Sequence, residues 1–274
     1  MDFYFKTSYK TALMIMGQLR LEDTNESAED KYNYHKNHFK HDNLYLWQWQ
    51  SELSQNPILN DLPCKKLIVR NDENPILSDD QKELMIQQYQ KTWDYYEHIK
   101  HQYIHMTKEQ CRGIELGVSK QFYQIGEMFK ECLDDNDIFI KTRYDIKYKM
   151  PFDMSKIQDF LITKKPVVFV PIGGDTPKGR GLGDLFYVMN RSAAKLMQDY
   201  LWKALELAEN NGPIHQESFF RYFLQNHHNV EINRFNFNLT RYHYEFLKMN
   251  DYFPNCNTPL IFRDNTPHIY EPQD

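Results

Sequence analysis

Apolar residues follow two different periods along the chain, and segments of the two kinds alternate. Short apolar segments, typical of buried strands, occur at 11–16, 43–49, 65–69, 138–140, 166–171 and 230–237. Longer segments with apolar residues three or four positions apart, typical of amphipathic helices, occur at 79–97, 108–133, 190–210 and 214–224. Strands that alternate with helices predict an α/β fold, with a mainly parallel sheet flanked by helices.

Two segments near the ends of the chain lack a clear period. Residues 22–42 are polar and are compatible with either a helix or a loop. The tail at about 250–274 is rich in proline and is expected to be irregular. A chain of 274 residues is short for two dinucleotide-binding domains, which need roughly 300 residues. We therefore predict a single domain over 1–274, with its core at about 11–240.

Composition narrows the expected partners and location. The net charge is −5 and no run of Lys and Arg stands out, so no nucleic-acid partner is expected. The cysteines at 64, 111, 132 and 256 lie far apart, which is typical of reduced thiols in a cytoplasmic protein. The N-terminal residues lack the apolar stretch of a signal peptide, and about 18 apolar residues nowhere run together, so no transmembrane segment is expected.

Residues 137–145 are the most informative segment for chemistry, because an apolar strand there ends in charged residues. Lys141, Arg143 and Asp145 occupy alternate positions, which point to one side of a strand. Ligands of open α/β sheets bind at the carboxyl ends of the strands. Two cations and a carboxylate at that place suit a diphosphate, with or without a divalent cation. An ion pair at the end of a strand would explain the same spacing equally well.

A glycine-rich stretch at 173–183 follows a predicted strand and contains Lys178 and Arg180. It matches neither the dinucleotide-binding pattern nor the P-loop pattern. We expect a loop that closes over substrate, with a plain surface connection as the alternative. Asp184 follows this stretch and precedes the apolar segment 185–190, which makes it a candidate for contacting an acceptor hydroxyl.

His215 and Glu217 open a predicted helix after the break at Gly212–Pro213. A glutamate at such a place is most often a capping residue. Sugar transfer also needs a carboxylate or an imidazole that accepts the proton of the acceptor hydroxyl, and Glu217 is a candidate for that base.

The order of these segments resembles that of glycosyltransferases of bacterial and large-virus polysaccharide synthesis. The matching features are a strand with a Gly-x-x-Arg turn at Gly17–Arg20, a Trp-containing strand at 42–47, an Arg-x-Asp strand at 137–145, an aspartate before an aromatic residue at 184–186 and a His-x-Glu helix start at 215–217. The resemblance extends from Thr11 to about Phe237, and it rests on the order and spacing of the motifs together.

The resemblance implies a GT-A-like fold and a nucleotide-sugar-dependent enzyme that transfers a sugar to a glycan, a glycolipid or another hydroxyl acceptor. It places Gly17, Gln18 and Arg20 near the nucleotide, and Arg143 and Asp145 near the sugar diphosphate or its metal. Lys141 would join the donor side, Asp184 and Glu217 would contact the transferred sugar or the acceptor, and Lys178, Arg180 and His215 would lie on the acceptor side or in the closing loop. A Mn²⁺ or Mg²⁺ cofactor would use Asp145. The usual signature is Asp-x-Asp, whereas this chain has Arg143 at the first position.

Two other classes of function stay open. Another nucleotide-dependent transferase on an α/β sheet is one of them, although a nucleotidyltransferase needs paired acidic metal ligands and a sulfotransferase needs a phosphate loop near the N-terminus. A non-catalytic glycan-binding derivative is the other. On the glycosyltransferase interpretation, Asp145→Asn should abolish sugar transfer and leave the melting temperature nearly unchanged.

Overall fold

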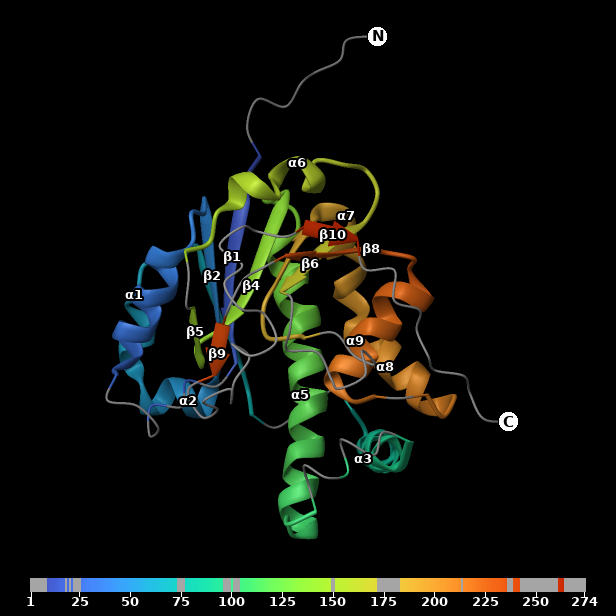
Figure 1. Cartoon of the computed structure of the whole chain (residues 1–274). Coiled ribbons are helices and arrows are strands. Elements are labelled where there is room, and N and C mark those ends of the chain that lie inside the picture. The colour runs from blue at the N-terminus through green and yellow to red at the C-terminus, as the bar shows by residue number, and fades with distance from the viewer. Residues whose placement is uncertain are drawn as a thin grey trace.

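The computed structural model describes residues 9–17, 19, 21, 26–72, 77–95, 100, 104–148, 151–171, 183–212, 214–235, 239–241 and 261–263. Within these residues an eight-stranded sheet has the order β10-β8-β6-β7-β4-β1-β2-β3, and a two-stranded sheet joins β5 to β9 (Figure 1). The strands are β1 Thr11–Met16, β2 Asn43–Trp49, β3 Lys66–Arg70, β4 Ile138–Arg143, β5 Ile146–Tyr148, β6 Val167–Pro171, β7 Tyr187–Asn190, β8 Glu231–Phe235, β9 Leu239–Arg241 and β10 Ile261–Arg263.

The large sheet is mainly parallel, as the alternation of strands and helices predicts. β1 pairs in parallel with β2 and with β4, β2 with β3, and β6 with β8. β7 is antiparallel to both of its neighbours, and β10 is antiparallel to β8. In the described part of the chain, all strands of this sheet except β7 and β10 therefore point the same way. Their carboxyl ends form one edge, at which β7 begins.

Helices cover both faces of the large sheet. The helices and helical turns of the described residues are α1 Ala28–His38, α2 Gln50–Gln55, η2 Pro57–Asn60, α3 Asp79–Tyr95, α5 Lys108–Cys132, η3 Met154–Lys156, α6 Gln158–Leu161, α7 Arg191–Leu196, η5 Met197–Asp199, α8 Tyr200–Glu209, α9 Gln216–Tyr222 and η6 Phe223–His227. Buried residues of α5, α7, α8 and α9 share one core cluster with one face of the strands, and α1 and α2 contribute to the cluster on the other face. None of the helices in the described segments is both long and apolar enough to cross a membrane.

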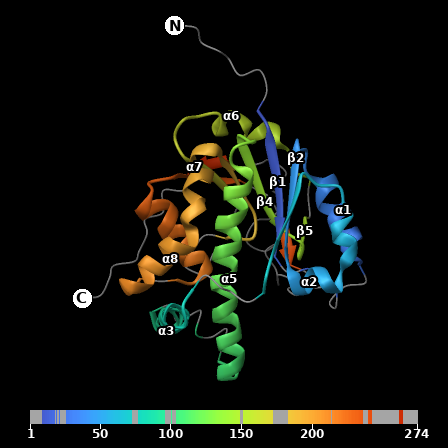
Figure 2. The ribbon, with the colours of Figure 1, turned by 180° about the vertical axis from the view of Figure 1, so that it is seen from behind.

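Helix α5 is the longest element and lies across the sheet, with its N-terminal half extending past the strands (Figure 2). A capping box begins it, in which Thr107 accepts from the backbone of Gln110 and the Gln110 side chain accepts from Thr107. Its apolar stripe buries Phe129, whose ring centre lies 5.8 Å from that of Phe139 on β4, and at its C-terminal end the thiol of Cys132 lies 3.3 Å from the sulfur of Met14 on β1. The sequence prediction of an amphipathic helix at 108–133 is confirmed.

The polar segment 22–42, for which two alternatives were open, contains a helix. Ser27 caps α1 in a capping box with Asp30, so this end of the helix has its own local signal. Few of its residues are buried, but Tyr32 and the fully buried Lys31 anchor it to the sheet side. Lys31 donates to the backbone oxygen of Leu19, at 2.6 Å, and so ties α1 to the chain that leaves β1.

Two differences from the predicted elements lie in the second half of the chain. The helix expected at 190–210 is divided into α7 and α8 by the 3₁₀ turn η5. This turn packs on α5 so closely that a Cβ on Gly126 would lie 3.0 Å from the backbone oxygen of Gln198. Within the tail expected to be irregular, Ile261–Arg263 form β10 at the edge of the sheet.

Candidate functional site

The ends of β1 and β4 meet at the carboxyl edge of the sheet. Met16 on β1 is in register with Arg143 on β4, so the residue that follows β1 lies beside the end of β4. That residue is Gly17, whose φ of 91° lies in the region that favours glycine. A Cβ built on Gly17 would lie 3.5 Å from both Cγ and Nε of Arg143. Gly17 and the end of the charged strand, which are far apart in sequence, are therefore neighbours.

Arg143 and Asp145 form a bidentate ion pair. The Nε of Arg143 donates to Oδ1 of Asp145 at 2.7 Å, and its Nη2 donates to Oδ2 at 2.8 Å. Asp145 is fully buried, and the side chain of Arg143 is 10% exposed. Two charge-assisted bonds in one plane fix the guanidinium in a single orientation. The ion pair that was one explanation of the spacing is thus present, at the edge where a ligand would bind.

Further carboxylates act on the Arg143 guanidinium. Burial alone would lower the pKa of Arg143. The negative charge of Asp145, and then those of Asp184 and Glu217, outweigh burial, so that the pKa is raised above its usual value. The guanidinium therefore stays charged at any physiological pH. Asp184 and Glu217 come from segments after β4, and their effect on Arg143 shows that the fold brings these expected site residues into one electrostatic neighbourhood.

Asp184 is held by two side chains from different elements. Its Oδ2 accepts from the amide of Gln121 on α5, and its backbone oxygen accepts from the ammonium of Lys141 on β4. Lys141 is only 1% exposed, and its Nζ lies 5.3 Å from the ring centre of Tyr187. Lys141 thus positions the chain at the start of β7, and its expected contact with a donor diphosphate stays a prediction.

His215 and Glu217 lie together at the start of α9. The Nδ1 of His215 is 2.8 Å from Oε2 of Glu217, with the imidazole nearly buried and the carboxylate 26% exposed. Tyr89 of α3 packs against this pair, because its ring centre is 5.6 Å from that of His215 and its hydroxyl donates to the amide oxygen of Gln216 at 3.4 Å. Glu217 therefore contacts the imidazole, a partner that the capping explanation does not involve.

Two glutamines of α5 contact residues of this site and were not expected from the sequence. Gln121 binds Asp184, as described above. Gln124, with its amide oriented to satisfy its neighbours, accepts from the backbone N–H of Gly17 at 3.0 Å and from the indole N–H of Trp47 at 3.1 Å. Gln124 is 4% exposed, although it is polar. The available signal was a pair of amides three residues apart beside the apolar stripe of a long helix.

Four of the expected site residues lie outside the described residues, namely Gln18, Arg20, Lys178 and Arg180. Their expected contacts with the nucleotide or the substrate stay predictions.

The residues around Asp145 do not fit a divalent cation. Mg²⁺ and Mn²⁺ prefer carboxylate oxygens as ligands, and both oxygens of Asp145 already accept from Arg143. Across the described part of the chain, no three His, Cys, Asp or Glu side chains come close enough together to hold a metal ion. The donor set at this edge is that of an ion pair.

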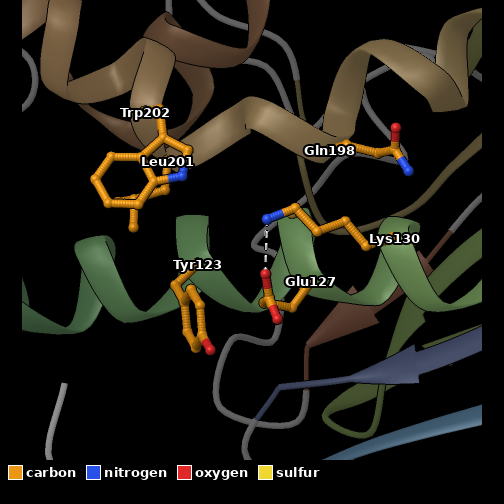
Figure 3. Close-up of a pocket in the computed structure, with 7 residues that line it drawn as sticks. Tyr123, Glu127, Lys130, Gln198, Leu201 and Trp202 are labelled. Atoms are coloured by element: carbon orange, nitrogen blue, oxygen red, sulfur yellow. Dashed lines mark hydrogen bonds and ion pairs between the residues drawn. The ribbon is translucent and has the colours of Figure 1, made fainter. Parts of the chain in front are cut away.

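A separate pocket lies between α5 and α8 (Figure 3). Its lining includes Tyr123 and Lys130 of α5 and Trp202 of α8, and Lys130 is bonded to Glu127 at 2.8 Å within it. None of the expected site residues lines this pocket, so we do not assign it to the site at the carboxyl edge.

Comparisons with known proteins give structural neighbours only. No protein-family model matches the chain, and no curated protein matches it. The chain is similar to the apo form of mouse xyloside xylosyltransferase 1, with 13% identity over 81% of this chain and 83% of that one and a TM-score of 0.37. It is also similar to a protein from Bacillus anthracis, described as a glucose-1-phosphate thymidylyltransferase in complex with sucrose. That match has 9% identity over 85% of this chain and 89% of that one, with a TM-score of 0.44.

Proposed function

We propose that this protein is a glycosyltransferase with a GT-A-like fold, which moves a sugar from a nucleoside-diphosphate sugar to a hydroxyl group of a glycan, a glycolipid or another acceptor. One observation supports this proposal most strongly. At the carboxyl edge of a mainly parallel sheet, a fixed guanidinium lies beside the glycine turn after β1 and within electrostatic range of two further carboxylates. Such an edge is where α/β sheets bind nucleotides.

Each group at this edge has a task in sugar transfer. The bond between the anomeric carbon and the diphosphate oxygen breaks, and the nucleoside diphosphate leaves with the electron pair. Arg143 would stabilise the negative charge that develops on this leaving group, because a preoriented cation gains most where charge appears. The acceptor oxygen forms the new bond to the anomeric carbon and loses its proton.

Glu217 is our candidate for the base that takes this proton. Its carboxylate is partly exposed, and its Oε2 lies 2.8 Å from Nδ1 of His215. Asp184 is our candidate for binding sugar hydroxyls, since one of its oxygens is fixed by Gln121. The acceptor would enter between these two carboxylates and the guanidinium.

The first test is a panel of nucleoside-diphosphate sugars, assayed for hydrolysis and for thermal stabilisation of the protein. We expect one donor class to raise the melting temperature, because ligand at a hundredfold excess over Kd increases the free energy of unfolding by about 2.7 kcal/mol. The same donor should be hydrolysed slowly to a nucleoside diphosphate. A nucleotidyltransferase would instead release pyrophosphate from a nucleoside triphosphate. A panel without any stabilising or hydrolysed donor would contradict the proposed function.

The second test uses Glu217→Gln, which keeps the shape of the side chain and removes its basicity. We expect transfer with the best donor to fall at least about a hundredfold, because general base catalysis contributes about 10²–10⁴. Glu209→Gln, at the exposed end of α8, is the matched control and should keep full activity. Equal activity of the two variants would remove Glu217 from the role of base.

A further inference from the structure

The guanidinium of Arg143 has N–H groups that its ion pair with Asp145 does not use. Arginine carries five N–H groups in a rigid fork, and Arg143 uses the one on Nε and one on Nη2 to bind Asp145. Among the described residues, none accepts from its remaining N–H groups. These groups therefore offer a planar set of donors to a ligand at the carboxyl edge.

Asp145 fixes the direction in which those donors point. It is fully buried and holds the guanidinium by two parallel bonds. A cation held in this way does not have to reorganise when an anion arrives. Gly17 lies beside this guanidinium, because a Cβ there would be in van der Waals contact, at 3.5 Å, with Nε and Cγ of Arg143.

The same pair leaves a metal ion without ligands at this position. A divalent cation that used Asp145 would have to displace both bonds to Arg143 and leave a buried guanidinium uncompensated, which is unfavourable. The cation that the fold supplies at the end of β4 is thus the side chain itself.

We propose that Arg143, positioned by Asp145, takes the place of a divalent cation at the diphosphate of the donor, so that this protein binds a diphosphate group without Mg²⁺ or Mn²⁺. The inference rests on the proposed function for the identity of the ligand. The local charges include the cations of Lys141 and Arg143 and the carboxylates of Asp145, Asp184 and Glu217. Because two cations and three carboxylates sum to a charge of −1, recognition would come from directed N–H bonds to phosphate oxygens rather than from a positive field.

The test is calorimetric titration of the full chain with inorganic pyrophosphate, which needs no knowledge of the nucleotide base. We expect binding in the presence of EDTA, with an affinity that Mn²⁺ does not raise more than about threefold. Arg143→Lys should weaken binding at least about tenfold, because a point charge cannot make the paired bonds of the fork.

Two further variants separate positioning from folding. Arg143→Met combined with Asp145→Asn removes both buried charges together, which a fold tolerates better than losing one, and should abolish binding. Asp145→Asn alone keeps the guanidinium but loosens it, so we expect weaker binding in a protein whose circular dichroism at 20 °C is unchanged. Arg191→Met is the control: Arg191 is an exposed arginine at the start of α7, at the opposite edge of the sheet, and its loss should leave affinity unchanged.

Pyrophosphate binding that requires Mn²⁺ or Mg²⁺, or that survives Arg143→Met/Asp145→Asn, would overturn this inference, as would no binding under any condition. The panel of nucleoside-diphosphate sugars tests the proposed function separately. If a nucleotide sugar is turned over and EDTA abolishes the turnover, the protein is a glycosyltransferase and only the metal-free inference fails.

Discussion

Buried ionisable side chains are the residues for which this fold has the largest consequences. Asp145 is fully buried and forms an ion pair with Arg143. Removing one partner of such a pair leaves the other charge uncompensated, at a typical cost of 3–5 kcal/mol. Asp145→Asn should therefore lower the melting temperature as well as the activity. The sequence alone suggested an almost unchanged melting temperature, since it could not show that Asp145 is enclosed.

A stability effect of pH is expected from His35. Burial lowers the pKa of His35 to about 3, against an opposing contribution from the backbone of Tyr144. In the unfolded chain the pKa is about 6.5, so between these values the unfolded state binds a proton that the folded state does not. The free energy of unfolding should then fall as the pH decreases through this window, by at most about 1.4 kcal/mol per pH unit from this group.

His35→Phe tests that expectation, because it removes the titrating group and keeps a ring among its aromatic neighbours. The free energy of unfolding of the variant and of the parent would be measured by urea denaturation between pH 6.5 and pH 4. Its decrease with falling pH should be shallower for the variant. His105→Phe changes an exposed histidine and should keep the slope of the parent. Parallel slopes for His35→Phe and the parent would mean that His35 is accessible to protons in the folded state.

Among the elements, α5 carries much of the architecture, and its glycines differ in their surroundings. A Cβ on Gly113 would meet no atom within 4 Å, whereas a Cβ on Gly126 would lie 3.0 Å from the backbone oxygen of Gln198. Gly113→Ala should stabilise the protein by about 0.5–1 kcal/mol, through the better helix propensity of alanine. Gly126→Ala should destabilise it by about 1 kcal/mol, because the turn η5 must move away.

Thermal melts of these two alanine variants provide the comparison. They share the same helix and the same change in propensity, so the difference in their melting temperatures reports the contact with η5. An equal gain in both variants would show that the packing of η5 on α5 relaxes without cost.

Elements with a clear period could be predicted from the sequence, and elements set by distant partners could not. The strand at 43–49 matches β2, because its burial on both faces leaves an apolar pattern. Strands β5, β9 and β10 have three residues each, which is too short for any period. The sequence also gave no sign that β7 is antiparallel, since direction depends on pairing with β4 and β6.

In the candidate site, too, some features could be predicted from the sequence and others depend on distant partners. The ends of β1 and β4 could be expected at one edge, and the structure places Gly17 beside Arg143 there. The bidentate bond to Asp145 could not be read from alternate positions, because the strand ends at Arg143 and the chain turns before Asp145. The contacts of α5 with Asp184 and Gly17 depend on how a helix crosses the sheet, which no local pattern encodes.

At the scale of the whole molecule, the sheet connects the two halves of the sequence. β4 and β7 pair over Ile138–Lys141 and Tyr187–Asn190, and β10 near the end of the chain extends the same sheet. We therefore expect one cooperative unfolding transition, in keeping with the prediction of a single domain.

Two variants that each keep a single tryptophan can test this cooperativity. One would retain Trp47 on β2, which is fully buried, and the other Trp202 on α8, which is 42% exposed. Their fluorescence midpoints in urea should coincide with each other and with the far-ultraviolet circular dichroism. Separate midpoints would show that the strands before α5 and the helices after β7 unfold independently.

The thiol of Cys132 lies where α5 meets β1, against the sulfur of Met14, and burial raises its pKa. An alkylating reagent can reach it only after helix and strand have parted. The reactivity of this thiol therefore reports the separation of α5 from β1. The rate at which Cys132 is labelled under native conditions would report how often the contact between α5 and β1 opens.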